Sequence, residues 1–301
     1  MHMSFYEQTP GRLSACEKSK NNNQVMLVMQ VFITAGQLFY PTAKSVKIES
    51  NPMLIPENII ANADDLGLNP SVSHAILYCY EQQYINSASL MTNTPHFEHA
   101  VDLIAANPVL KNIGIHTNFT EGKPLSNMPK EYLDEDGNWN KAKIKNKYNI
   151  VSGVHKEAFA KELDAQIQRA VSSRVTITHL DSHHHIHTLP SFHTIFLQAA
   201  KKYSLKLRLA QTFNKGNLLN YCYRKYVNST FKGAGLNYSD YFEDVHHYIR
   251  EGQFLKRAGT IEIMFHPGYN ETGSLLDHYD VDSLSKWTQF LTKELIYNYQ
   301  S

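Results

Sequence analysis

Short apolar runs and longer amphipathic segments alternate along the chain from residue 58 onward. Residues 58–63 (NIIANA) form an apolar run that ends in the polar turn Asp-Asp-Leu-Gly, which is typical of a buried strand followed by a loop. Asn69 and Pro70 give a helix-start signature, because asparagine caps a first turn and proline needs no N–H partner there. Apolar residues then recur every three or four positions as far as Tyr80. The pattern predicts a strand–loop–helix unit.

The same alternation continues towards the C-terminus. We expect strands at 87–92, 112–116, 174–180, 205–210 and 260–265, and helices at 97–106, 156–172, 192–202 and 283–297. Residues 117–150 have no period, which is typical of a functional or a disordered loop. Repeated strand–helix units indicate a parallel sheet covered by helices, either open or closed into a barrel. No break in composition divides residues 57–301, so one α/β domain is expected there.

The N-terminal region has a different pattern. Residues 1–24 are polar and without period, and we expect residues 1–50 to be a poorly ordered extension. Residues 25–43 are apolar but interrupted by Gln30 and Gln37, whereas a membrane span needs ~20 predominantly apolar residues. No membrane span is therefore expected. Because Lys18 and Lys20 precede the run, export through residues 18–43 stays an alternative to the expected cytoplasmic location, and a packed segment is a third.

Composition narrows the function classes. The 301 residues carry 29 Lys plus Arg and 28 Asp plus Glu, a formal charge of +1, so no basic excess is available for binding nucleic acid through its phosphates. Hydrophobic residues make up 42%, as in a packed globular protein. The three cysteines form neither a disulfide framework nor a zinc ribbon. Histidine is the unusual residue: six of the 16 lie between positions 179 and 193.

Residues able to bind metal follow four of the predicted strands. They are Asp64-Asp65, His116, the run 181–187 (DSHHHIH) and His266. In α/β folds the carboxyl ends of the strands share one rim, where ligands bind. Carboxylate and imidazole suit divalent metals, and a second carboxylate beside the metal can accept a proton from bound water. The aspartates alone could be turn residues and the lone histidines structural, but turn preferences do not explain the histidine run.

Three ordered motifs resemble the YdjC-like carbohydrate deacetylases. They are Asn-Ala-Asp-Asp-Leu-Gly at 62–67, Gly-Ile-His at 114–116 and Thr-His-Leu-Asp-Ser-His-His-His-Ile-His at 178–187. Weaker similarities are Gly-Lys-Pro-Leu at 122–125, Leu-Arg at 207–208 and Glu-Ile-Met-Phe-His-Pro at 262–267. The resemblance covers residues 57–290. It leaves out the first fifty residues, and the segment 214–254 matches no motif.

The resemblance implies a metal triad of Asp65, His116 and His183, with Asp64 as the neighbouring base. It also implies a modified TIM-like barrel with the metal site at the carboxyl ends of the strands, often dimeric, and an enzyme that removes the acetyl group from N-acetylated mono- or oligosaccharides of the chitooligosaccharide type. One divalent ion is expected. The resemblance implies Mg²⁺, whereas two imidazoles suit Zn²⁺ better.

Further roles follow from strand position and spacing. His266 ends a different strand and is our candidate acid for the departing amine. Arg208 could hold Asp64 ionised, or form a surface or structural salt bridge. We expect Asp181 to orient an imidazole. His187 stands four residues after His183, so on a helix it would be an alternative ligand. His185, like its neighbours, is undecided between orienting a ligand and contacting substrate.

Two other classes remain open. A different barrel metallohydrolase, such as a phosphoesterase or amidohydrolase, would use the same residue types, usually around two metal ions. A catalytically silent sugar- or metal-binding protein would keep the histidines and have no need of a base. Asp64 discriminates this last class, because replacing it should abolish hydrolysis and spare binding.

Overall fold

The computed structural model describes residues 55–146, 150–214, 216–251 and 258–300. All of them belong to one unit, which spans residues 50–301. The predicted extension over residues 1–50 and its apolar segment 25–43 lie outside the described residues, so their order and the route of export stay predictions. Among the described helices, none has both the length and the hydropathy needed to cross a membrane.

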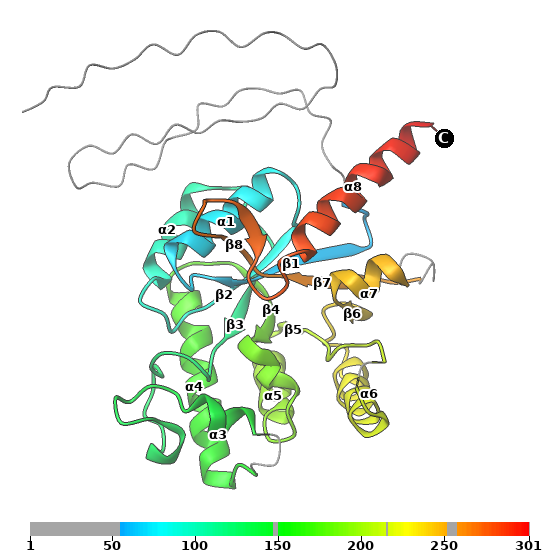
Figure 1. The fold of residues 1–301 in the computed structure, drawn as a ribbon. Helices are drawn as coiled ribbons and strands as arrows, with labels where there is room; N and C mark the ends of the chain where they lie inside the picture. Colours follow the sequence, from blue (N-terminus) through cyan, green and yellow to red (C-terminus); the bar gives the residue numbers. More distant parts are fainter. Residues whose placement is uncertain (1–54, 147–149, 215, 252–257, 301) are drawn as a thin grey trace, which may run out of the picture. The chain divides into compact units, whose positions relative to one another are not determined.

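Seven parallel strands in the described part of the chain form one central sheet, and helices surround it (Figure 1). They are β1 (Ile59–Leu66), β2 (Ser87–Leu90), β3 (Ile113–Thr117), β4 (Ile177–Ser182), β5 (Lys206–Leu207), β6 (Tyr241–Glu243) and β7 (Ile261–Phe265). Their order is β5-β4-β3-β2-β1-β7-β6. The N–H of Thr212, after β5, donates to the carbonyl of Phe242 in β6 at 3.0 Å, so the sheet curls and its edges approach. The parallel α/β class is confirmed.

The five helices that the sequence predicts are present in the described residues, together with three that it does not predict. They are α1 (Pro70–Glu81), α2 (Phe97–Ala106), α3 (Lys141–Lys145), α4 (Gly153–Ser172), α5 (His193–Tyr203), α6 (Leu218–Gly233), α7 (Val245–Arg250) and α8 (Ser283–Gln300). The short 3-10 helices are η1 (Lys130–Tyr132) and η2 (His183–Thr188). The strands β8 (Pro267–Tyr269) and β9 (Leu275–Asp277) pair in an antiparallel hairpin. The predicted cap is present, since the Asn69 side chain accepts the Val72 N–H at 2.9 Å.

Two of the expected strands are longer than those in the structure. The strand expected at 205–210 ends at Leu207. Further along, the Asn228 side chain accepts the N–H of Ala210 and donates to its carbonyl, so these groups do not pair with a strand. The strand expected from residue 174 begins only at Ile177. The segment 214–254, to which the sequence assigned no motif, contains α6, β6 and α7. The apolar residues at the start of α6 do not mark its buried side, since Leu218 and Leu219 are 71% and 81% exposed.

Two hydrophobic clusters fill the spaces between the sheet and its helices. One packs around β1, β2 and β7, and the other around β3, β4 and β5. Between them, a Cβ at Gly114 would lie 2.3 Å from the His179 ring, which stacks on Tyr238 at a centroid distance of 4.0 Å. Glycine at this position therefore allows the two rings to pack against β3.

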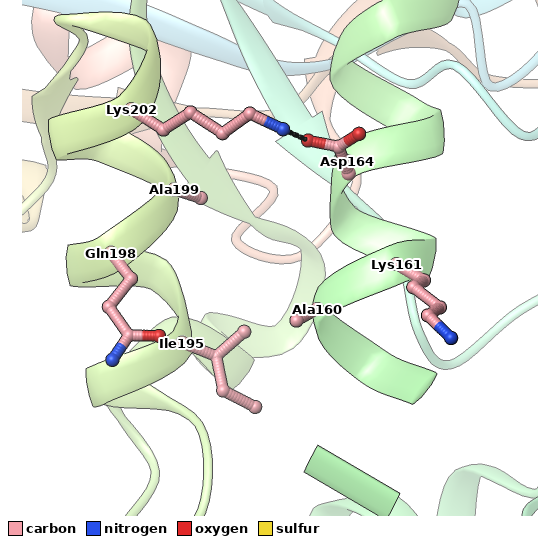
Figure 2. A pocket seen from close by; sticks show the side chains of 7 residues that line it. All are labelled: Ala160, Lys161, Asp164, Ile195, Gln198, Ala199 and Lys202. Atoms are coloured by element: carbon pink, nitrogen blue, oxygen red, sulfur yellow. Dashed lines mark hydrogen bonds and ion pairs between the residues drawn. The ribbon is translucent and has the colours of Figure 1, made fainter. Parts of the chain in front are cut away.

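A cavity of about 370 Å³ lies on the outer helical layer, between α4 and α5 (Figure 2). Lys202 of α5 and Asp164 of α4 form an ion pair across it. None of the residues predicted to act in catalysis or metal binding lines this cavity. The chemistry gathers elsewhere, where the strands end.

Candidate metal centre

The end of β1 carries both aspartates of the first motif. The pairing of β1 with β2 shifts register between Ala63 and Leu66, and Asp65 has a left-handed backbone, with φ of 71°. In a regular strand neighbouring side chains point to opposite faces, whereas an irregularity of this kind redirects one of them. Asp64 and Asp65 can therefore both reach His116, and both are buried.

Three side chains from β1, β3 and η2 meet at one point. His116 Nε2 lies 3.1 Å, and His183 Nδ1 2.9 Å, from the same oxygen, Asp65 Oδ1. The ligand atoms of the three residues lie within 4.8 Å of one another. Asp65 Oδ1 is buried and has no partner with hydrogen-bond geometry among the described residues, although both nitrogens are close. A cation between these atoms would satisfy that oxygen, so the three residues fit a metal ion.

Neighbouring charges shift the pKa values of all three side chains. Burial lowers the pKa of His116, but the charges of Asp181 and Asp64 raise it by more, so the net pKa is well above the ordinary value. The pKa of His183 is also raised, since Asp65 and Glu121 outweigh its burial. Burial alone would raise the pKa of Asp65, but the two imidazoles beside its Oδ1 bring it well below the ordinary value. A cation would replace protons on the imidazoles.

Arg208 joins three carboxylates behind the triad. It donates to Asp64 Oδ2 from Nη1 at 2.7 Å and to Asp64 Oδ1 from Nη2 at 2.6 Å. It also lies 2.8 Å from Asp181 Oδ2 and 2.6 Å from Glu262 Oε1. Arg208 is fully buried, so the alternative of a surface salt bridge was wrong. Burial raises the pKa of Asp64, but Arg208 outweighs it and the net pKa is lowered.

Asp181 and His266 contact different members of the centre. Asp181 Oδ1 is 2.7 Å from His116 Nδ1, the nitrogen that faces away from Asp65. His266 Nε2 is 3.8 Å from Asp64 Oδ2, and its Nδ1 is 3.6 Å from Asp277. Burial lowers the pKa of His266, but the contact of its ring with Asp277 and the charge of Asp64 give a net increase. These contacts favour the protonated form of the His266 ring beside Asp64.

The histidine run does not continue as a regular helix. His184 and His185 have φ of 56° and 55° inside η2, a left-handed backbone that strains any residue with a side chain. The helical spacing that made His187 an alternative ligand is therefore absent. Its Nδ1 lies 2.7 Å from Ser182 Oγ, and it belongs to none of the metal-ligand groups found in the described residues. His185 Nδ1 is buried and has no hydrogen-bond partner among the residues that the structure describes.

The sequence analysis missed two carboxylates at the centre. Glu121 Oε2 lies 3.5 Å from His183 Nε2, and Glu262 bonds Arg208. Glu121 directly precedes the weak motif at 122–125, but its loop gave no reason to place it near the histidines. Glu262 could have been predicted from the sequence, because a charge inside the apolar run IEIMF must be paired when it is buried.

Comparison with known proteins agrees with this geometry. Residues 58–295 match the family model described as YdjC-like protein. A carbohydrate deacetylase of Geobacillus stearothermophilus is 33% identical over 71% of this chain and 81% of its own length. One from Brevibacillus brevis is 31% identical over 70% of this chain and 81% of its own.

The fold also has a solved counterpart. A crystal structure from Enterococcus faecalis, of a protein named for cellobiose-phosphate cleavage, superposes with a TM-score of 0.60. It covers 79% of this chain and 92% of its own, at 22% identity, which supports the fold alone. The match to the family model spans most of the chain, and with it the strands that carry the candidate metal ligands. The chain belongs to the YdjC-like protein family.

Proposed function

We propose that this protein is a metal-dependent hydrolase that removes the acetyl group from N-acetylated sugars. The observation that carries the proposal is the convergence of Asp65, His116 and His183 on one buried oxygen that lacks a hydrogen bond. Relatives named carbohydrate deacetylases, at 31–33% identity, supply the substrate class. The chemistry is the hydrolysis of an amide bond.

Asp65, His116 and His183 would hold the ion, and the remaining groups handle protons. A divalent ion in such a site polarises the acetyl carbonyl and acidifies a water molecule. Asp64 is ionised because Arg208 lowers its pKa, and it stands beside the triad as the proton acceptor. Arg208 also fixes the orientation of this carboxylate through two hydrogen bonds.

His266 is the donor to the departing amine in this proposal. Its raised pKa favours the protonated ring, and Asp277 holds His266 through the backbone N–H and the ring. Tyr279 packs edge-on against the ring at 4.4 Å. Asp64 and His266 therefore form an acceptor–donor pair, which amide hydrolysis requires.

The finer features of the enzyme belong to the same proposal. The curled sheet supports a modified TIM-like barrel, with the metal site at the carboxyl ends of its strands. Two imidazoles in the triad favour Zn²⁺ by ligand type, while the resemblance implies Mg²⁺. The substrate is a mono- or oligosaccharide of the chitooligosaccharide type, and the protein is a homodimer by resemblance to its family.

Acetate release from a series of N-acetylglucosamine oligomers tests the function. We expect release that a chelator abolishes and that added Zn²⁺ or Mg²⁺ restores. The substitution Asp64→Asn should reduce the rate by about 10²–10⁴-fold, the usual contribution of a general base, and leave metal binding intact. Asp102→Asn, at an exposed position of α2, is the matched control.

Three results would contradict the proposal. Failure to release acetate from any oligomer would exclude the deacetylase. Full activity of Asp64→Asn would exclude its role as base. Two ions per active chain would favour the phosphoesterase or amidohydrolase alternative.

A further inference from the structure

The imidazole of His183 faces two carboxylates with its two nitrogens. Nδ1 lies 2.9 Å from Asp65 Oδ1, on the side of the triad, and Nε2 lies 3.5 Å from Glu121 Oε2 on the other side. At 3.5 Å the second contact is an ion pair and not a hydrogen bond. His183 Nε2 is buried and has no hydrogen-bond partner among the described residues. A buried ring nitrogen without a hydrogen-bond partner therefore faces a carboxylate oxygen.

His116 shows the same arrangement in a closed form. Its Nε2 faces Asp65 at 3.1 Å, and its Nδ1 is 2.7 Å from Asp181 Oδ1. Each histidine of the triad thus has one nitrogen towards Asp65 and one towards a second carboxylate. A neutral imidazole carries one donor and one acceptor, so an acceptor at one nitrogen leaves the other nitrogen free to bind a metal.

The backbone around Glu121 is fixed although its side chain is half-exposed. The Asn118 side chain is buried, accepts the N–H groups of Thr120 and Glu121 at 3.0 Å, and donates to the Glu121 carbonyl at 2.8 Å. Lys141 Nζ lies 2.8 Å from Glu121 Oε1 and leaves Oε2 towards His183. The turn therefore aims the half-exposed carboxylate at the imidazole.

We propose that Glu121 is a positioning residue for the metal site. Its carboxylate accepts the Nε2–H of His183, which selects the tautomer whose Nδ1 lone pair points towards Asp65 and His116. The inference rests on the metal triad of the proposed function and goes beyond it, because Glu121 acts on the ion only through His183.

A competing use of the same residues is a second metal ion. Ligand atoms of Glu121, His183 and His184 also lie within 4.8 Å of one another. With its proton on Nε2, however, His183 has no lone pair there for a second ion. The two arrangements exclude each other while Nδ1 binds the first ion, so the number of ions per chain distinguishes them.

Titration of the metal-free, full-length protein with Co²⁺ tests the inference by calorimetry and visible spectroscopy. We expect one ion per chain, and a Kd that rises about 10–100-fold in Glu121→Ala, the usual effect of losing a partner of a metal-bound histidine. Glu121→Gln keeps a neutral acceptor, so its Kd should lie between those of Glu121→Ala and the wild type. The absorption bands should keep their positions in both variants, because no ligand is lost. Glu131→Ala is the matched control, since Glu131 pairs with His155 in a similarly exposed ion pair.

Each other outcome has a defined meaning. An unchanged Kd in Glu121→Ala would overturn the positioning role and leave the triad intact. Shifted bands in that variant would make Glu121 a ligand, and two ions per wild-type chain would assign it to a second site; either would overturn the inference. Failure of the wild type to bind Co²⁺ would instead overturn the proposed triad, on which the inference depends.

Discussion

The two histidines of the metal centre have carboxylate partners in contrasting surroundings. His116 and Asp181 are both buried, 2.7 Å apart, and Asp181 also contacts Arg208. His183 and Glu121 are 3.5 Å apart, and the Glu121 side chain is 39% exposed. The first pair belongs to a closed network of charges, while the second opens towards solvent and a surface lysine.

We expect loss of the buried pair to affect folding, and loss of the exposed pair to affect metal binding. Buried charges destabilise a fold unless each has a partner, so a change in the Arg208 network should affect the whole protein. An exposed carboxylate keeps its solvation when its partner is lost, so a change at Glu121 should affect mainly the ion. We call His116, Asp181 and Arg208 the buried half of the centre, and His183, Glu121 and Lys141 its open half.

The largest effect is expected from Arg208→Met. The substitution leaves Asp64, Asp181 and Glu262 buried without their shared cation, and breaking a buried ion pair from one side costs roughly 3–5 kcal/mol. Urea unfolding measures the loss of unfolding free energy. Arg174→Met, at an exposed arginine, is the control and should change it by less than about 0.5 kcal/mol. A fully stable Arg208→Met protein would mean that the network is not needed for folding.

Glu262 should make the buried half sensitive to pH. Burial raises the pKa of Glu262 to about 7, although Arg208 acts in the opposite direction. This folded-state pKa lies above the ordinary value of 4.5, so the contribution of its proton to stability is complete below about pH 4.5 and is lost as pH rises through about 7. The lost stability is at most about 3 kcal/mol.

Glu262→Gln cannot titrate and should remove this dependence. We expect the unfolding free energy of the metal-free wild type to fall relative to Glu262→Gln between pH 5 and 8.5. The exposed Glu81→Gln is the control and should follow the wild type. A constant difference between wild type and Glu262→Gln over this range would show that Glu262 does not titrate there.

The sequence could predict the side chains that end apolar strands. Asp64, Asp65, His116 and His266 each follow such a run, and a parallel sheet brings strand ends to one rim. Pairing across the site was harder to predict. Glu121 is 62 positions from His183 and lies on a loop without period, so only the turn built by Asn118 brings the two side chains together.

The left-handed backbone conformations at the centre could not be predicted from the sequence either. The left-handed conformations of Asp65, His184 and His185 break the periods on which prediction of side-chain direction depends. For this reason a helical spacing of four suggested His187 as a ligand, whereas its Nδ1 lies beside Ser182. Helix α6 was missed because its first apolar residues face solvent and its stripe is short.

Asp181→Asn and Glu121→Ala compare the two halves directly. The substitution Asp181→Asn would keep a neutral acceptor for His116 but remove the charge opposite Arg208, and losing a charged hydrogen-bond partner costs about 1–3 kcal/mol. We expect Asp181→Asn to lower both the unfolding free energy and the affinity for Co²⁺. Glu121→Ala should lower the affinity alone. Equal destabilisation by both substitutions, measured in urea without metal, would remove the distinction between a closed and an open half.

The smallest effect is expected at the outer edge of the open half, from Lys141→Met. Lys141 holds Glu121 Oε1 at 2.8 Å, but its side chain is 46% exposed, and an exposed ion pair contributes less than about 1 kcal/mol. Because Lys141 acts on the ion only through Glu121 and His183, its loss should raise the Kd for Co²⁺ about 2- to 3-fold. High salt should remove the difference, since screening already weakens the pair in the wild type. Lys202→Met is the matched control, because its ion pair with Asp164 lies on the outer helices, at the cavity of Figure 2. A tenfold or larger effect of Lys141→Met would mean that Lys141 does more than hold Glu121, and that the open half is as tightly constrained as the buried one.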